Sequence, residues 1–222
     1  MPLKRDLTPL EARCLAVLVE KQHTVPDSYP LSLNALVLGC NQKTARDPVI
    51  AASEGDVQVA VDALKALSLA FESSGSRVAR YEHNLGRALG IPSQSVALLA
   101  TLVLRGPQTP AELRTAAERL HRFADVSAVE GFLDELAARP AEKGGALVVK
   151  LPRAPGAREQ RWAHQLSGPV DVAALPVAAD DESIVATSEL VALKARLAAA
   201  EGEIARLGAL IERLCRELDV RP

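Results

Sequence analysis

Histidine, cysteine and carboxylate side chains are the residues most able to do chemistry, and in this sequence they are scattered. The four histidines, His23, His83, His121 and His164, lie far apart, and none has a second ligand at metal-binding spacing. The three cysteines contain no C-x-x-C pair, and no nucleophile elbow, phosphate loop or dinucleotide fingerprint occurs. We therefore expect a protein that is not an enzyme and holds no cofactor and no metal, although a site built from distant residues would leave no local motif.

Basic and amide side chains form a second set, which could bind a ligand because arginine and lysine hold phosphate groups without reading base sequence. They fall in two stretches that we predict to be β-hairpins and in one polar loop. The candidate contact residues are Arg77 and Arg80 in the first hairpin, Lys150, Arg153, Arg158 and Arg161 in the second, and Gln42, Lys43 and Arg46 in the loop. The alternative is that the hairpin charges only keep the surface soluble.

Helix-start signals indicate which elements carry these hairpins. Thr8, Pro9 and Glu11 form a capping box with proline at the first helical position, which predicts a helix to about residue 21. Ser32 and Ser53 predict the starts of two further helices. Short strands around a glycine-containing turn then complete an order of three helices and a hairpin, which is typical of a winged helix.

The same order of elements recurs after residue 85. We expect a first helix capped by Ser93, a second that opens with the capping box of Thr109 and Glu112 and reaches about Leu120, and a third over residues 126–139. The sequence thus predicts a mainly α protein with small β-hairpins (α+β): tandem winged-helix domains plus a C-terminal coiled-coil-like helix. The expected limits are 1–85 and 86–168 for the winged-helix domains, 169–187 for a flexible acidic linker and 188–222 for the heptad-repeat helix.

The third helix of a winged helix normally enters the major groove of DNA, but both third helices here carry net negative charge. A phosphate backbone repels such helices, and Gln58 is the main candidate for reading a base edge. We therefore expect DNA binding, in a regulatory role, chiefly through phosphate contacts of the hairpins. The alternative function is a protein–protein interaction adaptor that binds no DNA.

The loop that carries Gln42, Lys43 and Arg46 is longer than the turn of a standard helix-turn-helix. Asn41 suits the C-cap of the preceding helix, and Cys40 is expected to be a small buried hydrophobe. A role in bracing the first domain is therefore favoured over a binding role for this loop.

Apolar side chains recur every seven residues near the C-terminus, which is the pattern of a coiled coil. We expect a homodimer, because a soluble protein seldom exposes such a stripe. An antiparallel pair, a trimer and packing onto the domains stay open. The expected dimer seam is Leu190, Leu193, Leu197, Ile204, Leu207, Ile211, Leu214 and Leu218.

Composition is typical of a helical protein of the cytoplasm. Hydrophobic residues make up 48% and aromatic residues only 3%, and a sparse, odd number of cysteines fits a reducing compartment. Neither a signal peptide nor an apolar run of membrane-spanning length is present, so we expect no membrane partner. The net charge is −2, but residues 86–168 hold 11 Lys and Arg against eight Asp and Glu, so this segment alone attracts a polyanion, and only weakly.

Four segments also resemble a known family. They are LTPLEARCLAVLVEKQ, YPLSLNALVLGCNQKTARDPV, TLVLRGPQTPAELR and REQRWAHQLSG, in this order over about residues 5 to 168. Together they resemble the YceH-type family of uncharacterised bacterial proteins. The resemblance implies a tandem winged-helix fold, and it implies no activity, substrate or catalytic residue.

Overall fold

A computed structural model describes residues 5–73, 78–153 and 156–170, which belong to one compact unit spanning residues 1–174. A second unit covers residues 175–222. The predicted dimer seam falls in it and lies outside the described residues. The described part contains seven α-helices and two small antiparallel sheets, so the α+β class that the sequence predicts is confirmed.

The first half of the compact unit packs helices against a three-stranded sheet. Its strands have the order β1-β3-β2, and both pairings are antiparallel. Its elements are α1 (Pro9–Thr24), a 3-10 turn (Pro26–Ser28), β1 (Leu31–Ser32), α2 (Leu33–Cys40), α3 (Glu54–Ala66), β2 (Ala70–Ser73), β3 (Arg80–His83) and α4 (Leu85–Leu89).

The second half repeats much of this order with a two-stranded sheet. Its hairpin pairs β4 with β5, so that Lys150 lies opposite Trp162. Its elements are α5 (Ser93–Arg105), α6 (Pro110–Ala116), α7 (Val126–Ala137), a 3-10 turn (Ala141–Lys143), β4 (Val148–Lys150) and β5 (Trp162–His164).

Side-chain caps start most of these helices where the sequence predicts. The Thr8 hydroxyl accepts from the Glu11 backbone N–H, and the Glu11 carboxylate accepts from the Thr8 backbone N–H. The same reciprocal bonds open α3 and α6. The predicted capping boxes are therefore confirmed.

Some predicted boundaries need correction. Ser93 does not cap α5 as the sequence predicts. Pro92 occupies the N-cap, no side chain makes a capping hydrogen bond there, and Ser93 is the first helical residue. Helix α6 ends at Ala116 rather than near Leu120, because the backbone N–H groups of Leu120 and His121 both donate to the carbonyl of Ala117 and tighten the chain into a turn. Helix α1 extends to Thr24 rather than to about residue 21.

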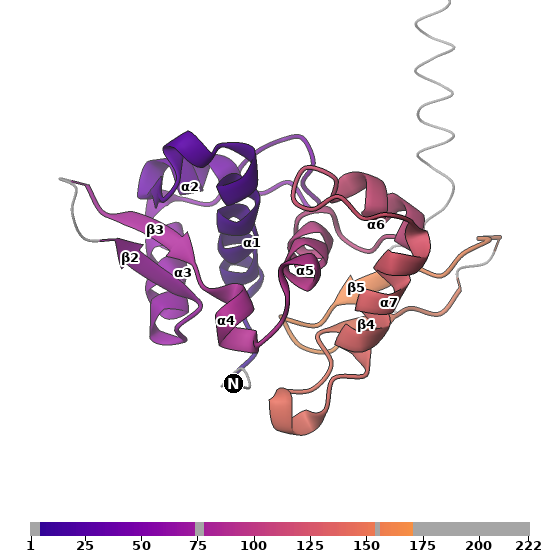
Figure 1. Cartoon of the computed structure of the whole chain (residues 1–222). Helices are drawn as coiled ribbons and strands as arrows, with labels where there is room; N and C mark the ends of the chain where they lie inside the picture. Colours follow the sequence, from indigo (N-terminus) through magenta and orange to yellow (C-terminus); the bar gives the residue numbers. More distant parts are fainter. Residues whose placement is uncertain (1–4, 74–77, 154–155, 171–222) are drawn as a thin grey trace, which may run out of the picture. The chain divides into compact units, whose positions relative to one another are not determined.

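Two helices, one from each half, form the centre of the unit. Every side chain from Glu11 to Val19 in α1 and from Ser95 to Leu104 in α5 is buried, and the two helices pack against each other (Figure 1). A helix that is buried all round needs partners on every side. Helix α1 also contacts α2 and α3, while α5 also contacts α6 and α7, so one continuous apolar core serves both halves.

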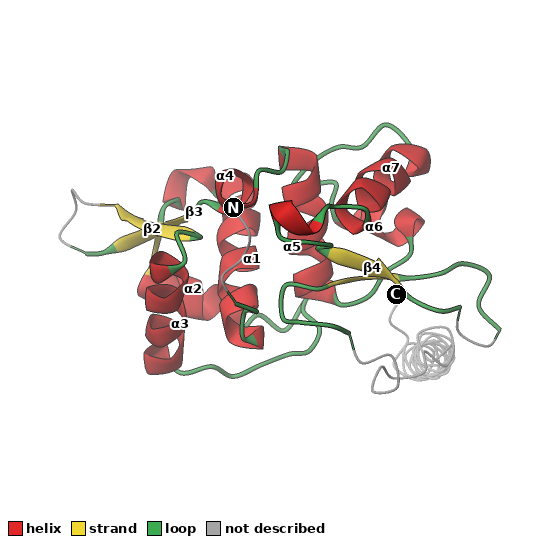
Figure 2. Cartoon of the chain, turned by 90° about the horizontal axis from the view of Figure 1, so that it is seen from below, coloured by secondary structure: helices red, strands yellow, loops and turns green. Residues whose placement is uncertain are grey.

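The two hairpins lie at opposite ends of this unit. Strands β2 and β3 lie on one side of the α1–α5 pair, and β4 and β5 lie on the other, in both views (Figures 1 and 2).

In residues 5–73, 78–153 and 156–170, no helix is both long and apolar enough to cross a bilayer.

Candidate functional site

The second hairpin is held firmly at its base. The Trp162 backbone N–H donates to the Gln108 carbonyl at 2.7 Å, and the Gln108 N–H donates back to the Trp162 carbonyl at 3.1 Å. The Trp162 side chain is buried, and the exposed Lys150 ammonium lies 5.5 Å from the centre of its ring. The hairpin thus joins the core of the second half through Trp162 and presents Lys150 at the surface.

Of the other three cations of the second hairpin, one is engaged by the protein. The Arg161 guanidinium donates to the Pro107 carbonyl and to the Glu112 carboxylate, both at 3.1 Å. Arg153 and Arg158 are exposed and make no hydrogen bond or ion pair with any residue that the structure describes. Within the second hairpin, these two guanidinium groups keep all of their N–H donors available for a ligand.

In the first hairpin, one of the two candidate cations is held by backbone groups of the protein. The Arg80 guanidinium donates to the carbonyls of Pro30, at 2.8 Å, and Ser28, so it fastens the turn before β1 to the sheet. Arg77 lies outside the described residues. The exposed side chains that the hairpin does present include Phe71, which is 44% exposed.

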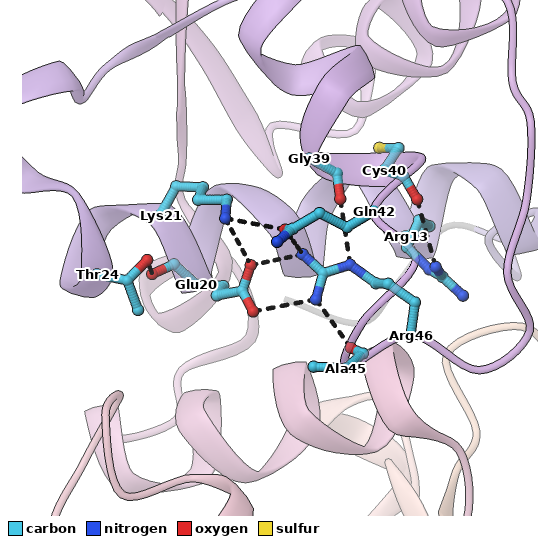
Figure 3. A network of polar contacts seen from close by, with 9 residues as sticks. All are labelled: Arg13, Glu20, Lys21, Thr24, Gly39, Cys40, Gln42, Ala45 and Arg46. Carbon is cyan, nitrogen blue, oxygen red and sulfur yellow. Dashed lines mark hydrogen bonds and ion pairs between the residues drawn. The ribbon is translucent and has the colours of Figure 1, made fainter. Parts of the chain in front are cut away.

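The polar loop after α2, for which the sequence favours a bracing role over a binding role, folds inward around Arg46. The Arg46 side chain is fully buried, and its two terminal nitrogens donate to both carboxylate oxygens of Glu20, at 3.0 and 2.6 Å (Figure 3). Its remaining donors meet the carbonyls of Gly39 and Ala45 and the Gln42 side chain. A guanidinium with these partners has no donor left for a phosphate.

The other two candidates of this loop have different environments. The Gln42 amide oxygen accepts from Lys21 at 3.0 Å as well as from Arg46, so it belongs to the same network (Figure 3). Lys43 is exposed. Asn41 occupies the C-cap of α2 as the sequence predicts, and its side chain bonds both backbone groups of Ala52.

The charge of Glu20 depends on this network. Burial raises the pKa of the Glu20 carboxyl, but the hydrogen bonds and positive charge of Arg46, followed by the charge of Lys21, outweigh it, so the net pKa is lowered. The carboxylate therefore stays ionised and committed to Arg46 at neutral pH.

The surface of α3 offers little for reading bases. Gln58 donates to Asp62 at 3.0 Å and accepts from the Tyr81 hydroxyl at 3.4 Å, so both ends of its amide are engaged. Asp62 and Glu54 are exposed on the same helix, as are Glu130 and Asp134 on α7. The outer faces of both helices would repel a phosphate backbone.

Two arginines outside the predicted hairpins and polar loop lie near that loop. Arg105 at the end of α5 and Arg119 after α6 line a cleft of about 230 Å³ together with Lys21 and Glu20. Sequence spacing gives no signal for this grouping, because the cations come from three separate segments that meet only in the folded unit.

Cysteine and histidine side chains form no metal site in the part of the chain that the structure describes. Cys14 and Cys40 are free and fully buried, with their sulfur atoms 3.7 Å apart, and the burial expected for Cys40 is confirmed. The hydrogen bond to Cys40 and burial raise the pKa of the Cys14 thiol, which makes it a poor nucleophile at neutral pH.

Comparison with known proteins gives a consistent family but no activity. The model of a family described as "Protein of unknown function, DUF480" matches residues 7–157. The UPF0502 protein of Leptothrix cholodnii is 61% identical over 221 residues, which are 98% of this chain and 98% of the relative. A UPF0502 protein of Burkholderia pseudomallei (strain 668) is 60% identical over 219 residues, or 99% of this chain and 92% of the relative. That of Burkholderia multivorans is 61% identical over 217 residues, or 97% and 91%.

Proposed function

Because this chain belongs to the DUF480 family of bacterial proteins, whose description states no activity, we propose a function from the surface of the chain itself. The proposed function is that of a non-enzymatic DNA-binding protein of the cytoplasm with a regulatory role. The chain would contact mainly phosphates, through its second hairpin. The narrower resemblance to the YceH-type family stays a prediction.

We assign a winged-helix fold to each half. In the first half, α1, β1, α2, α3, β2 and β3 follow one another in the order of that fold, and β3 pairs with both other strands. In the second half, α5, α6 and α7 precede the β4–β5 hairpin. This repeated order supports the assignment, and it makes each hairpin a wing.

One observation carries the DNA-binding proposal: Arg153 and Arg158 are exposed at the second hairpin without a partner among the described residues. Arginine binds phosphate oxygens with paired N–H donors, and each phosphate contact releases condensed counterions. Since α3 and α7 present carboxylates, we expect contacts that position the protein on a duplex without reading its sequence.

A salt titration tests the DNA-binding proposal. Binding of the full chain to a random-sequence duplex, followed by fluorescence anisotropy from about 50 to 200 mM salt, should weaken linearly in log–log form, with a slope of about −0.9 per phosphate contacted. Arg158→Glu should weaken binding at every salt concentration, and the double change with Arg153→Glu should weaken it further.

Arg87→Glu is the matched control, because it makes the same charge change at an exposed arginine of α4. It should leave duplex affinity nearly unchanged. Absence of binding at 50 mM salt would remove the proposal, and an equal loss in Arg87→Glu and Arg158→Glu would show a net-charge effect rather than contact through the hairpin.

Exposed apolar side chains of the first half favour a second candidate function, that of a protein–protein adaptor. Val59 on the outer face of α3 is 71% exposed, and Phe71 is exposed on the edge strand β2. Apolar groups on such elements are a feature of protein interfaces.

Co-purification from nuclease-treated lysate tests the adaptor. A partner that the wild type retains without nucleic acid should be lost from the Val59→Ser and Phe71→Ser variants and kept by Arg158→Glu. A partner lost equally from all three, or none at all, counts against this candidate.

A further inference from the structure

The cleft beside the polar loop has a surplus of positive charge. It is lined by Lys21 from α1, by Arg105 from the end of α5, and by Arg119 from the turn after α6. Arg105 and Arg119 make no hydrogen bond or ion pair with any described residue, and both are exposed. Ten guanidinium N–H donors thus remain available at one place.

Glu20 is the only carboxylate among the residues that line the cleft, and it is already engaged. Both of its oxygens accept from the guanidinium of Arg46, whose side chain is buried and does not line the cleft (Figure 3). The charge of Glu20 is therefore balanced by that of Arg46, and Lys21, Arg105 and Arg119 add three positive charges at the cleft. Of these three, the Lys21 ammonium also lies 3.3 Å from a Glu20 oxygen and donates to Gln42.

Helix ends reduce this surplus but do not cancel it. The C-terminal ends of α1, α5 and α6 lie at the cleft, and each contributes a partial charge of up to about −0.5. About one and a half positive charges therefore remain, which attract an anion. Asp47 lies against Gly106, next to Arg105, and is not among the lining residues.

Polar groups around the cations suit oxygen-rich ligands. The Thr44 hydroxyl and the Gln42 amide also line the cleft, and Ala45 adopts a left-handed backbone conformation there, with φ of 57°. Residues held in this strained region concentrate at binding sites. The volume of about 230 Å³ is smaller than that of usual cofactor sites, so the cleft fits a small ligand rather than a dinucleotide.

We propose that this cleft binds the phosphate groups of a small anionic ligand, held by Arg105 and Arg119 of the second half and Lys21 of the first. Guanidinium groups bind phosphate oxygens with paired, charge-assisted N–H donors. The ligand joins the two halves of the unit across the α1–α5 pair. The cleft shares no lining residue with the second hairpin, so this proposal is independent of the proposed DNA contact.

Titration calorimetry of the full chain with pyrophosphate, at constant ionic strength, tests this site. The wild type should bind about one equivalent saturably, and Arg105→Gln and Arg119→Gln should each weaken the affinity at least tenfold. Arg122→Gln is the matched control, because Arg122 is exposed near Arg119 in sequence but does not line the cleft. It should keep the wild-type affinity.

Further titrations distinguish binding in the cleft from anion binding elsewhere on the protein. Arg158→Glu should leave pyrophosphate affinity unchanged, whereas an equal loss in Arg158→Glu and Arg119→Gln would overturn the cleft assignment. Malonate that binds as tightly as pyrophosphate would overturn the choice of phosphate. No saturable binding, with folded variants verified by circular dichroism, would overturn the proposal, whatever the outcome of the duplex titration.

Discussion

Arg46 uses its charge inside the molecule rather than at the surface. Its guanidinium and the Glu20 carboxylate form a bidentate pair whose arginine side chain is fully buried. Removing one partner of a buried pair leaves the other charge without compensation in a poorly hydrated place. The pair therefore holds the polar loop against α1.

We expect Arg46→Met to lower the free energy of unfolding by about 3 kcal/mol, because Glu20 loses its main counter-charge. The double variant with Glu20→Gln should recover much of this loss. Urea denaturation at pH 7 measures both values. A double variant as unstable as the single one would show that shape, rather than charge, holds the loop.

His164 is a second residue whose environment has a measurable consequence. Burial lowers the pKa of its imidazole from 6.5 to about 4, and its Nδ1 atom is buried without a partner among the described residues. Between these two pH values the unfolded chain binds a proton that the folded chain does not. The free energy of unfolding therefore falls as the pH drops from 6.5 to 4.

For His164 this loss should reach about 3 kcal/mol near pH 4. His164→Leu removes the titrating group and the unpaired nitrogen, so its stability should fall less over the same interval. Thermal or urea unfolding of both proteins at several pH values measures the difference. Parallel stability curves for the two proteins from pH 6.5 to 4 would contradict the expected linkage.

At the scale of elements, glycine allows α2 to approach α1. A Cβ atom on Gly39 would lie 2.5 Å from Cγ1 of Val17, which is itself fully buried. Neither helix can retreat easily, because α1 is packed on all sides. The position of the polar loop, which follows α2, depends on this close approach.

Gly39→Ala should therefore destabilise the protein by about 1–3 kcal/mol through overpacking, although alanine favours helices. Gly131→Ala in α7 is the matched control, because an added Cβ there meets nothing within 4 Å. It should stabilise the protein by up to about 1 kcal/mol. Chemical denaturation of both variants checks the contrast in sign, and a stabilised Gly39→Ala would contradict the proposed close contact.

At the scale of the whole molecule, the heptad pattern of residues 188–222 remains a prediction of a dimer seam. Removal of these residues should change the solution mass from dimer to monomer, because the repeated apolar positions would lose their partner. Light scattering of the full and shortened chains measures this change. A shortened chain that stays dimeric would place the interface elsewhere.

The two halves of the compact unit are joined through a shared core. Helices α1 and α5 contribute to one continuous core, so the first and second halves share buried surface. The predicted division of the chain at residue 85 stays a prediction, as does the DNA-binding role.

Local signals were sufficient for much of the fold. Capping boxes at Thr8, Ser53 and Thr109 act within four residues, so the sequence reveals the helix starts. The short strand β1 and helix α4 were not predicted, because two residues paired with β3 and one five-residue helix carry no periodic pattern.

Charge placement was harder to predict than secondary structure. The sequence favours a bracing role for the loop of Arg46, but it does not show that Arg46 is buried while Arg158 is exposed. Their difference arises from Glu20, which lies 26 residues before Arg46 and meets it only after folding.

By itself, the sequence determined the starts of the helices that open with capping boxes, the two hairpins and the acidic character of α3 and α7, because these depend on neighbouring residues along the chain. The tertiary structure decided which cations remain available. Arg46 is bonded to Glu20 and Gln42 in the folded protein, and Arg80 and Arg161 also donate to protein groups. Arg105 and Arg119, by contrast, line one cleft. The physical reason is that a side chain's free donors depend on acceptors contributed by distant segments, and local spacing contains no information about those.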